Sequence, residues 1–144
     1  MREILFRGKT TKKEQEIHAF HNVWVEGDLI KNREKWHIHP KSNCFRFEKE
    51  LAKCMIAHEV IPETVGQFTG LTDKNGKKIF ESDIVKGLFL HGSAILGVVA
   101  FQDGTFGLAW KRGKIDEFSP FPCMCNVDYE IVGNIHDNPE LLGE

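Results

Sequence analysis

Apolar and polar residues alternate in short runs along the second half of the chain. The runs at residues 95–101 and 106–110 flank the turn-forming segment 102–105, and this order predicts a hairpin. Residues 72–77 contain the pair Asn75-Gly76, which readily adopts the positive φ angles of a tight turn. Short strands joined by glycine-rich turns are typical of a twisted sheet or a small barrel.

Four further segments of this half have assignable patterns. Residues 65–71 predict a strand in which two glycines indicate bulging or a close backbone approach. Residues 83–85 begin another strand, and residues 129–135 form the last one. Residues 119–122 include two prolines and predict an irregular loop.

The pattern in the first half of the chain is less regular. Residues 4–8 predict a short strand, and residues 24–30 predict a hairpin that turns at Gly27, because apolar pairs flank Glu26-Gly27-Asp28. Residues 31–43 are charged and aperiodic, so no element is predicted there. Residues 45–58 fit both a helix and a strand; we favour a short helix leading into a strand, and the sequence leaves both open.

These elements predict a mainly β, β-dominated α+β fold. The 144 residues are expected to form a single domain with an N-terminal β extension (residues 1–60) and a twisted-sheet or barrel-like C-terminal part (residues 61–144). A short helical turn is expected at the C-terminal end, because Asn138 is a favourable cap and Pro139 suits the first helical position.

The chain has no apolar run long enough to cross a bilayer, and the longest, residues 94–101, has the length of a strand. Residues 1–7 break off after three apolar positions, which is not the pattern of a signal peptide. We therefore expect the chain to stay in the cytoplasm where it is made. Its cysteines are expected to be free thiols: Cys44, Cys54, Cys123 and Cys125.

Charge is distributed unevenly along the sequence. Residues 1–114 hold all 19 Lys and Arg and 14 acidic residues, a net +5, whereas residues 115–144 hold seven acidic residues and no Lys or Arg. This asymmetry is compatible with a basic partner-binding face or an acidic contact surface. It is equally compatible with an acidic tail that packs beside the basic body and neutralises it.

Three consecutive segments, IPETVGQFTGL (residues 61–71), DKNGK (73–77) and IFESDIV (79–85), closely resemble the signature of the YopX family. The resemblance extends to both chain ends and fades between residues 31 and 58. It implies a mainly β fold in proteins carried by phages and prophages of bacteria, with no assigned biochemical role and no cofactor. The expected location is then the cytoplasm of a bacterial host cell. Ser82 departs from the family, where glycine usually precedes the aspartate, and a non-glycine residue argues against a positive φ angle there.

The signature residues have an architectural interpretation. Pro62 restricts the backbone, Gly66 and Gly70 permit bends, and Asn75-Gly76 forms a tight turn. The motif is therefore predicted to specify a fold rather than a site.

Metal binding and catalysis have little support in the sequence. No pair among the candidate zinc ligands has the standard spacing of a structural zinc site, so no metal is predicted. These ligands are His37, His39, Cys44, Cys123 and Cys125.

General acid–base catalysis could use carboxylates, and four of them lie around one predicted turn: Glu63, Asp73, Glu81 and Asp83. Lysines in the same turn make it a solvated loop of mixed charge. We predict no catalytic residue, with a small hydrolase as a distant alternative.

Nucleic-acid binding is the leading alternative to protein binding. Basic residues of the second half are predicted to form a rim, with an aromatic ring available for stacking. The candidate residues are Lys74, Lys77, Lys78, Lys86, Trp110, Lys111, Arg112 and Lys114. Phe106 is a second candidate for stacking. The slightly negative net charge and the acidic tail oppose this interpretation.

A non-enzymatic phage accessory module is the function that requires no special motif in the sequence. It is expected to bind a host or phage protein, or a second copy of itself through its acidic tail and basic body. No membrane, cofactor or small-molecule partner is predicted.

Overall fold

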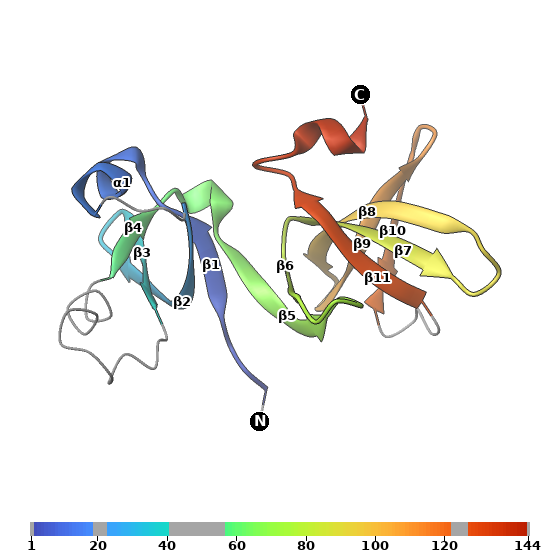
Figure 1. Cartoon of the computed structure of the whole chain (residues 1–144), viewed down its shortest axis with the longest axis horizontal. Coiled ribbons are helices and arrows are strands. Elements are labelled where there is room, and N and C mark those ends of the chain that lie inside the picture. The colour runs from blue at the N-terminus through green and yellow to red at the C-terminus, as the bar shows by residue number, and fades with distance from the viewer. Residues whose placement is uncertain (1, 19–22, 41–56, 122–126, 144) are drawn as a thin grey trace. The chain divides into compact units, whose positions relative to one another are not determined.

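The computed structural model describes residues 2–18, 23–40, 57–121 and 127–143. It confirms the mainly β fold, with antiparallel sheets and few helical turns (Figure 1). The chain forms two compact units, Met1–Gln67 and Phe68–Glu144, so the division lies several residues after the predicted position. No helix within the described ranges is both long and apolar enough to span a membrane.

The first unit is an antiparallel sheet with strand order β4-β3-β2-β1 and a short helix. Its elements are β1 (Phe6–Lys9), α1 (Lys12–His18), β2 (Trp24–Asn32), β3 (Lys35–Pro40), β4 (His58–Val60) and the 3-10 turn η2 (Pro62–Thr64). The start of β5 (Gly66–Thr72) pairs with β1, through Gly66 and Gln67. Ile38, Val60 and Leu5 are buried in this unit.

The predicted hairpin at Gly27 is wrong. Gly27 lies within the single strand β2, and the chain turns at Arg33 and Glu34 instead. A Cβ atom at Gly27 would lie 1.9 Å from the carbonyl oxygen of His39, so glycine permits the close approach of β3 rather than a turn. Strand β3 was not predicted at all, although Trp36 and Ile38 alternate there with polar residues.

The ambiguous segment of the first unit is only partly described. Residues 41–56 lie outside the described ranges, so the choice between helix and strand for residues 45–56 is not decided. His58 begins β4, in agreement with the predicted strand at the end of that segment.

The second unit contains a five-stranded antiparallel sheet with strand order β10-β9-β8-β7-β11. Its elements are β6 (Lys78–Phe80), β7 (Asp83–Phe89), β8 (Ala94–Gln102), β9 (Thr105–Arg112), β10 (Ile115–Pro120), β11 (Val127–Asn134) and the 3-10 turn η4 (Pro139–Leu142). The later part of β5 pairs with β6. Across the described strands β10 and β11 are opposite edges, so this sheet is open and does not form the closed barrel that was one of the two predicted forms.

Local turn signals predicted this unit well. The β8–β9 hairpin is confirmed, with positive φ angles at Asp103 and Gly104 that define a type I′ turn. The Asn75-Gly76 turn is confirmed by a φ of +80° at Gly76. The predicted irregularity of β5 is also confirmed, because its register with β6 shifts between Phe68 and Thr72 around Gly70.

The predicted loop at residues 119–122 is wrong in its first half. Ser119 and Pro120 end the edge strand β10, where proline is tolerated because no neighbouring strand needs its N–H group. Pairing is tight here, since a Cβ atom on Gly107 would lie 2.3 Å from the carbonyl oxygen of Ser119. The terminal helical turn is confirmed, but the Asn138 side chain does not cap it; its Oδ1 accepts the Asn134 N–H at 3.3 Å.

A cluster of buried residues in the second unit lies on one face of the sheet. Its buried members are Ile79, Val85, Val99, Leu108 and Phe121. Partly buried rings of Phe106, Trp110 and Tyr129 pack against them. Because side chains alternate along each strand, the residues between these positions lie on the outer face.

Ser82 has a φ of +71°, which contradicts the expectation that a non-glycine residue avoids this conformation. Tertiary hydrogen bonds hold the residue in place. Its N–H donates to the carbonyl of Val99 at 2.9 Å, and its carbonyl accepts the N–H of Ile135 at 3.0 Å. The surrounding structure therefore imposes a backbone conformation that serine disfavours.

Substituting glycine for Ser82 is expected to raise the free energy of unfolding by roughly 0.5–1 kcal/mol. Glycine removes the strain energy that a left-handed L-residue has in the folded chain. This gain is larger than the loss of stability that glycine causes by increasing the conformational entropy of the unfolded chain. Urea unfolding compared with Ser82→Ala, which removes the hydroxyl but keeps the strain, measures the effect. An equal change in both variants would contradict the strain.

Candidate functional site

The two signature aspartates hold backbone groups. Asp73 is 6% exposed, and its Oδ1 accepts the N–H groups of Asn75 and Lys77, each at 2.9 Å. Its Oδ2 accepts the N–H of Ile131 at 3.1 Å, so this carboxylate joins the β5–β6 turn to β11.

Asp83, 1% exposed, accepts the N–H of Phe80 at 2.8 Å through Oδ2 and closes the β6–β7 turn. Like Asp73, it therefore has an architectural role that explains its burial.

The pKa of Asp73 reflects these contacts. Burial raises the pKa of the carboxyl, whereas the N–H groups of Ile131, Lys77 and Asn75 and the Lys77 charge lower it. The pKa ends below its ordinary value of 3.8. Asp73 is thus held as a carboxylate that accepts hydrogen bonds, which is the opposite of a residue tuned to deliver protons near neutral pH.

Metal ligands do not converge in the described ranges. No three His, Cys, Asp or Glu side chains there lie close enough together to hold an ion. All four cysteines lie outside those ranges. His37 and His39 lie on the same face of β3.

A buried pair that sequence reasoning missed lies in the first unit. His58 Nδ1 of β4 is 3.3 Å from Glu14 Oε2 of α1, and both side chains are largely buried. The residues are 44 positions apart, so no spacing signal connects them. The contact ties α1 to the edge of the sheet.

The predicted basic residues are distributed over several elements of the second unit. Lys74 and Lys77 lie in the β5–β6 turn, Lys78 in β6, Lys86 in β7, Trp110, Lys111 and Arg112 in β9, and Lys114 in the β9–β10 turn. The aromatic candidates, Trp110 and Phe106, pack against the core.

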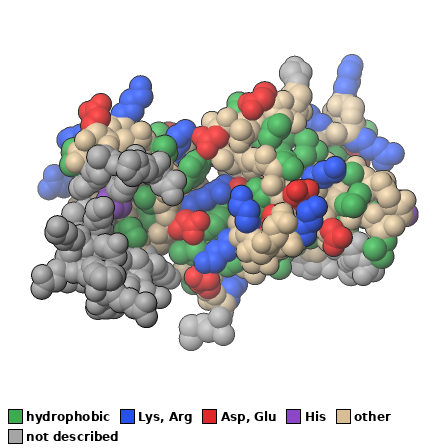
Figure 2. Space-filling model, in the orientation of Figure 1, with side chains coloured by type: hydrophobic (Ala, Val, Ile, Leu, Met, Phe, Trp, Pro, Cys, Tyr) green, Lys and Arg blue, Asp and Glu red, His purple; other side chains and the backbone are tan. Residues whose placement is uncertain are grey.

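Acidic residues lie next to several of these lysines. Lys74 Nζ is 3.2 Å from Glu130 Oε2, and Lys86 is the cross-strand partner of Glu130. Lys111 is the cross-strand partner of Asp116. Figure 2 likewise shows basic and acidic side chains interspersed. The acidic tail thus contributes residues that offset positive charge within the unit.

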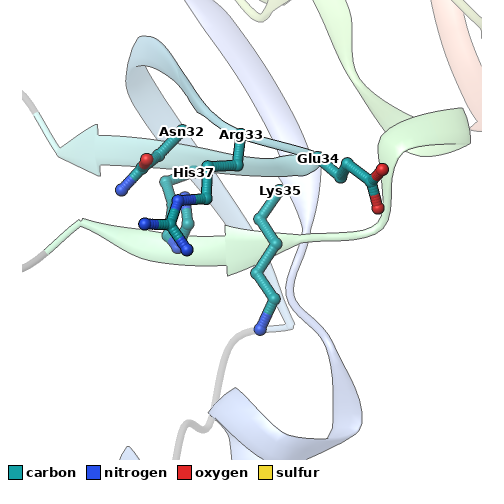
Figure 3. Close-up of a pocket in the computed structure, with 5 residues that line it drawn as sticks. All are labelled: Asn32, Arg33, Glu34, Lys35 and His37. Carbon is teal, nitrogen blue, oxygen red and sulfur yellow. The ribbon is translucent and has the colours of Figure 1, made fainter.

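A polar hollow lies at the β2–β3 turn of the first unit (Figure 3). Its volume is about 670 Å³, and its described lining residues are Asn32, Arg33, Glu34, Lys35 and His37. The Arg33 side chain extends back toward Asn32 and His37, whereas Lys35 points away from them. Lys35 Nζ lies 3.8 Å from Glu59 Oε2. Charges of both signs therefore surround this hollow.

A second hollow lies on the C-terminal sheet and is lined by both apolar and charged residues. Its volume is about 670 Å³. Its lining residues are Leu96, Val98, Gln102, Ala109, Trp110, Lys111, Asp116, Glu117, Phe118, Leu142 and Gly143. We call this surface the outer groove.

The floor of the outer groove is a row of apolar residues across three strands. Val98 of β8 is the register partner of Ala109 of β9, which is the partner of Phe118 of β10. Ile84 of β7 is the register partner of Val98 but is fully buried and does not line the groove. The Phe118 ring lies over Gly107, where a Cβ atom would come within 2.7 Å of its Cζ atom.

The rim of the outer groove is mixed. Leu96 is 39% exposed, and the exposed residues Lys111 and Asp116 carry opposite charges. Leu142 and Gly143 of the C-terminal turn also line the groove. The turn packs on β11, since a Cβ atom on Gly133 would lie 2.8 Å from Leu141 Cδ1.

Sequence reasoning did not identify this groove, although one signal was present. Residues 94–101 are apolar on both faces of the strand, whereas a half-exposed strand alternates with polar residues. Leu96 and Val98 occupy outward positions of this strand, where polar residues would be expected.

Comparison with known proteins identifies the family of the chain. Protein EF1440 from Enterococcus faecalis, a solved structure, is similar, with 22% identity, 99% of each chain covered and a TM-score of 0.46. A search of curated proteins finds no match. The family model described as YopX protein matches residues 5–143, nearly the whole sequence. The chain therefore belongs to the YopX family.

Proposed function

We propose that this YopX-family chain is a non-enzymatic phage or prophage accessory protein that acts in the bacterial cytoplasm by binding another protein through the outer groove. The observation that carries the proposal is the apolar row Val98–Ala109–Phe118 on the face opposite the core. An antiparallel sheet ordinarily presents polar residues on its solvent face. Apolar surface rimmed by polar residues is typical of an interaction site.

The charges around the groove favour a protein over a nucleic acid. A phosphate backbone is bound by basic side chains without nearby acids. Here the exposed Lys111 is the cross-strand partner of Asp116, so a carboxylate accompanies the basic side chain at the rim of the groove. Mixed charge around an apolar centre resembles the polar rim of a protein interface.

The contacts of the signature aspartates support a non-enzymatic role. Asp73 and Asp83 accept hydrogen bonds from backbone N–H groups of the β5–β6 and β6–β7 segments and of β11. Their carboxylates therefore serve the fold of this unit.

Site-specific photo-crosslinking tests the proposal. A photoreactive amino acid replaces Leu96 in the groove, and the matched control replaces Leu90, which is 83% exposed at the β7–β8 turn and does not line the groove. In bacteria producing the chain together with the phage or prophage genes that accompany it, we expect a discrete protein adduct from position 96 and none from position 90. Equal adducts from both positions, or none from position 96, would contradict the groove as the binding surface.

A further inference from the structure

The β9–β10 hairpin determines which backbone groups of β10 point outward. Arg112 and Ile115 are partners across a two-residue turn, in which Gly113 has a φ of +64°. Such a turn is closed by a hydrogen-bonded pair, and hydrogen-bonded and non-hydrogen-bonded pairs then alternate along the ladder. Glu117 and Ser119 therefore bond to β9, whereas Asp116 and Phe118 direct their N–H and carbonyl groups away from it.

These outward groups lie on an edge of the sheet. β10 is the terminal strand in the order of the described strands, and no described element hydrogen-bonds to the backbone of Asp116 or Phe118 from the other side. Pro120 ends the strand and has no N–H group, so pairing along this edge is limited to a short segment. The edge borders the outer groove, which Asp116, Glu117 and Phe118 help to line.

Resting on the function proposed above, we propose that the partner presents an extended segment that pairs with β10 and adds a strand to the sheet. Backbone hydrogen bonds to Asp116 and Phe118 supply the pairing. An apolar side chain of the segment lies beside Phe118 and continues the row from Val98 and Ala109. A Lys or Arg side chain on the opposite face of the segment meets Glu117.

The side chains of β10 favour such a partner over a second copy of this chain. Antiparallel self-pairing that joins Asp116 of one chain to Phe118 of the other places Glu117 directly opposite Glu117. Like charges at directly opposite positions are unfavourable in a sheet. A basic residue of the partner segment opposite Glu117 forms an attractive cross-strand pair instead. The edge therefore favours a segment in which apolar and basic residues alternate.

Amide hydrogen exchange on the full chain tests this inference. The probe is a synthetic heptapeptide of alternating lysine and valine with blocked ends. At saturating peptide we expect exchange of the Asp116 and Phe118 amides to slow about tenfold. Exchange at Glu117 and Ser119 should change little, because these amides already bond to β9. The control peptide carries N-methyl groups on alternate residues, which remove its pairing donors, and should give no protection.

A charge reversal tests the partner chemistry. Glu117→Lys should lose binding of the lysine–valine peptide and gain binding of a glutamate–valine peptide of the same length. Urea unfolding of this variant verifies that the fold is retained, and Glu117→Gln, which should bind the lysine–valine peptide more weakly than the parent chain, serves as a second check.

The outcomes separate this inference from the proposed function. Changes in the NMR chemical shifts of Val98 and Ala109 on adding peptide, without slower exchange of the Asp116 and Phe118 amides, would overturn strand addition. The groove would then remain a binding surface. A Leu96 crosslink to a partner, without any response to the peptide, would overturn the basic partner segment alone. Concentration-dependent protection of the same amides without peptide would overturn the inference in favour of a second copy.

Discussion

Replacing Asp73 by alanine is expected to lower the free energy of unfolding by about 4 kcal/mol. The carboxylate accepts N–H groups from Asn75, Lys77 and Ile131, and the substitution leaves all three without this acceptor. The three bonds are part-buried, and a hydrogen bond to a charged acceptor contributes roughly 1.5–3 kcal/mol. Urea unfolding followed by circular dichroism measures the loss.

Two further variants isolate the cause. Asp73→Asn keeps one side-chain oxygen that can accept the N–H groups of the turn, but its NH₂ group faces another donor. We therefore expect about half of the stability loss of Asp73→Ala. Asp128→Ala removes an exposed carboxylate of β11 and should change stability by less than about 0.5 kcal/mol. A similar loss in Asp73→Ala and Asp128→Ala would contradict the hydrogen-bonding role.

The same contacts predict a pH dependence. The pKa of Asp73 in the folded chain is below its ordinary value of 3.8, so the unfolded chain binds a proton at this group more readily. The contribution of Asp73 to stability is therefore complete above about pH 4 and is lost as pH falls through the folded pKa. Parallel loss of stability below pH 4 in the parent chain and Asp73→Asn would show that other groups are responsible.

Replacing Gly27 by alanine is expected to destabilise the first unit by about 3 kcal/mol. The added Cβ would lie 1.9 Å from the His39 oxygen and 2.8 Å from the Pro40 Cα, and both are backbone atoms that cannot rotate away. Relief requires β2 and β3 to move apart, so the cost is expected at the upper end of the roughly 1–3 kcal/mol that overpacking usually costs. Amide exchange of β2 and β3 measures the loss of pairing.

Gly76→Ala is the matched control for backbone conformation. Gly76 has a φ of +80° and open space around its Cα, so alanine there adds strain of about 1 kcal/mol without a collision. If Gly27 were in the turn of the hairpin predicted from the sequence, Gly27→Ala would lower stability only as much as Gly76→Ala does. A loss at Gly27 no larger than that at Gly76 would therefore contradict the close approach of β3.

Turns with strong local preferences could be predicted from the sequence, and turns imposed by contacts could not. Asn75-Gly76 and the segment at Asp103 and Gly104 contain residues that adopt positive φ angles at little cost. Ser82 and Arg33 also have positive φ angles, of +71° and +57°, without that local preference. At Ser82 the deciding hydrogen bonds come from distant strands, and these are invisible to a local pattern.

The candidate site was predicted less well than the fold. The basic residues singled out in the sequence lie next to acids such as Glu130 and Asp116, which a local charge count does not reveal. The outer groove depends on the register of β8, β9 and β10, which places Val98, Ala109 and Phe118 in one row. Register is set by pairing between strands, so no single segment contains this information.

The sequence by itself determined the YopX resemblance, the mainly β fold and the tight turns, because alternation and glycine preferences act within a few residues. Only the tertiary structure decided that Gly27 serves a close contact rather than a turn, and that Asp73 reaches Ile131 across 58 positions. It alone also placed the apolar row beside β10, which is an edge strand among the described strands. The physical reason is the same in each case: these features arise from atoms that meet only after strands distant in the sequence have paired.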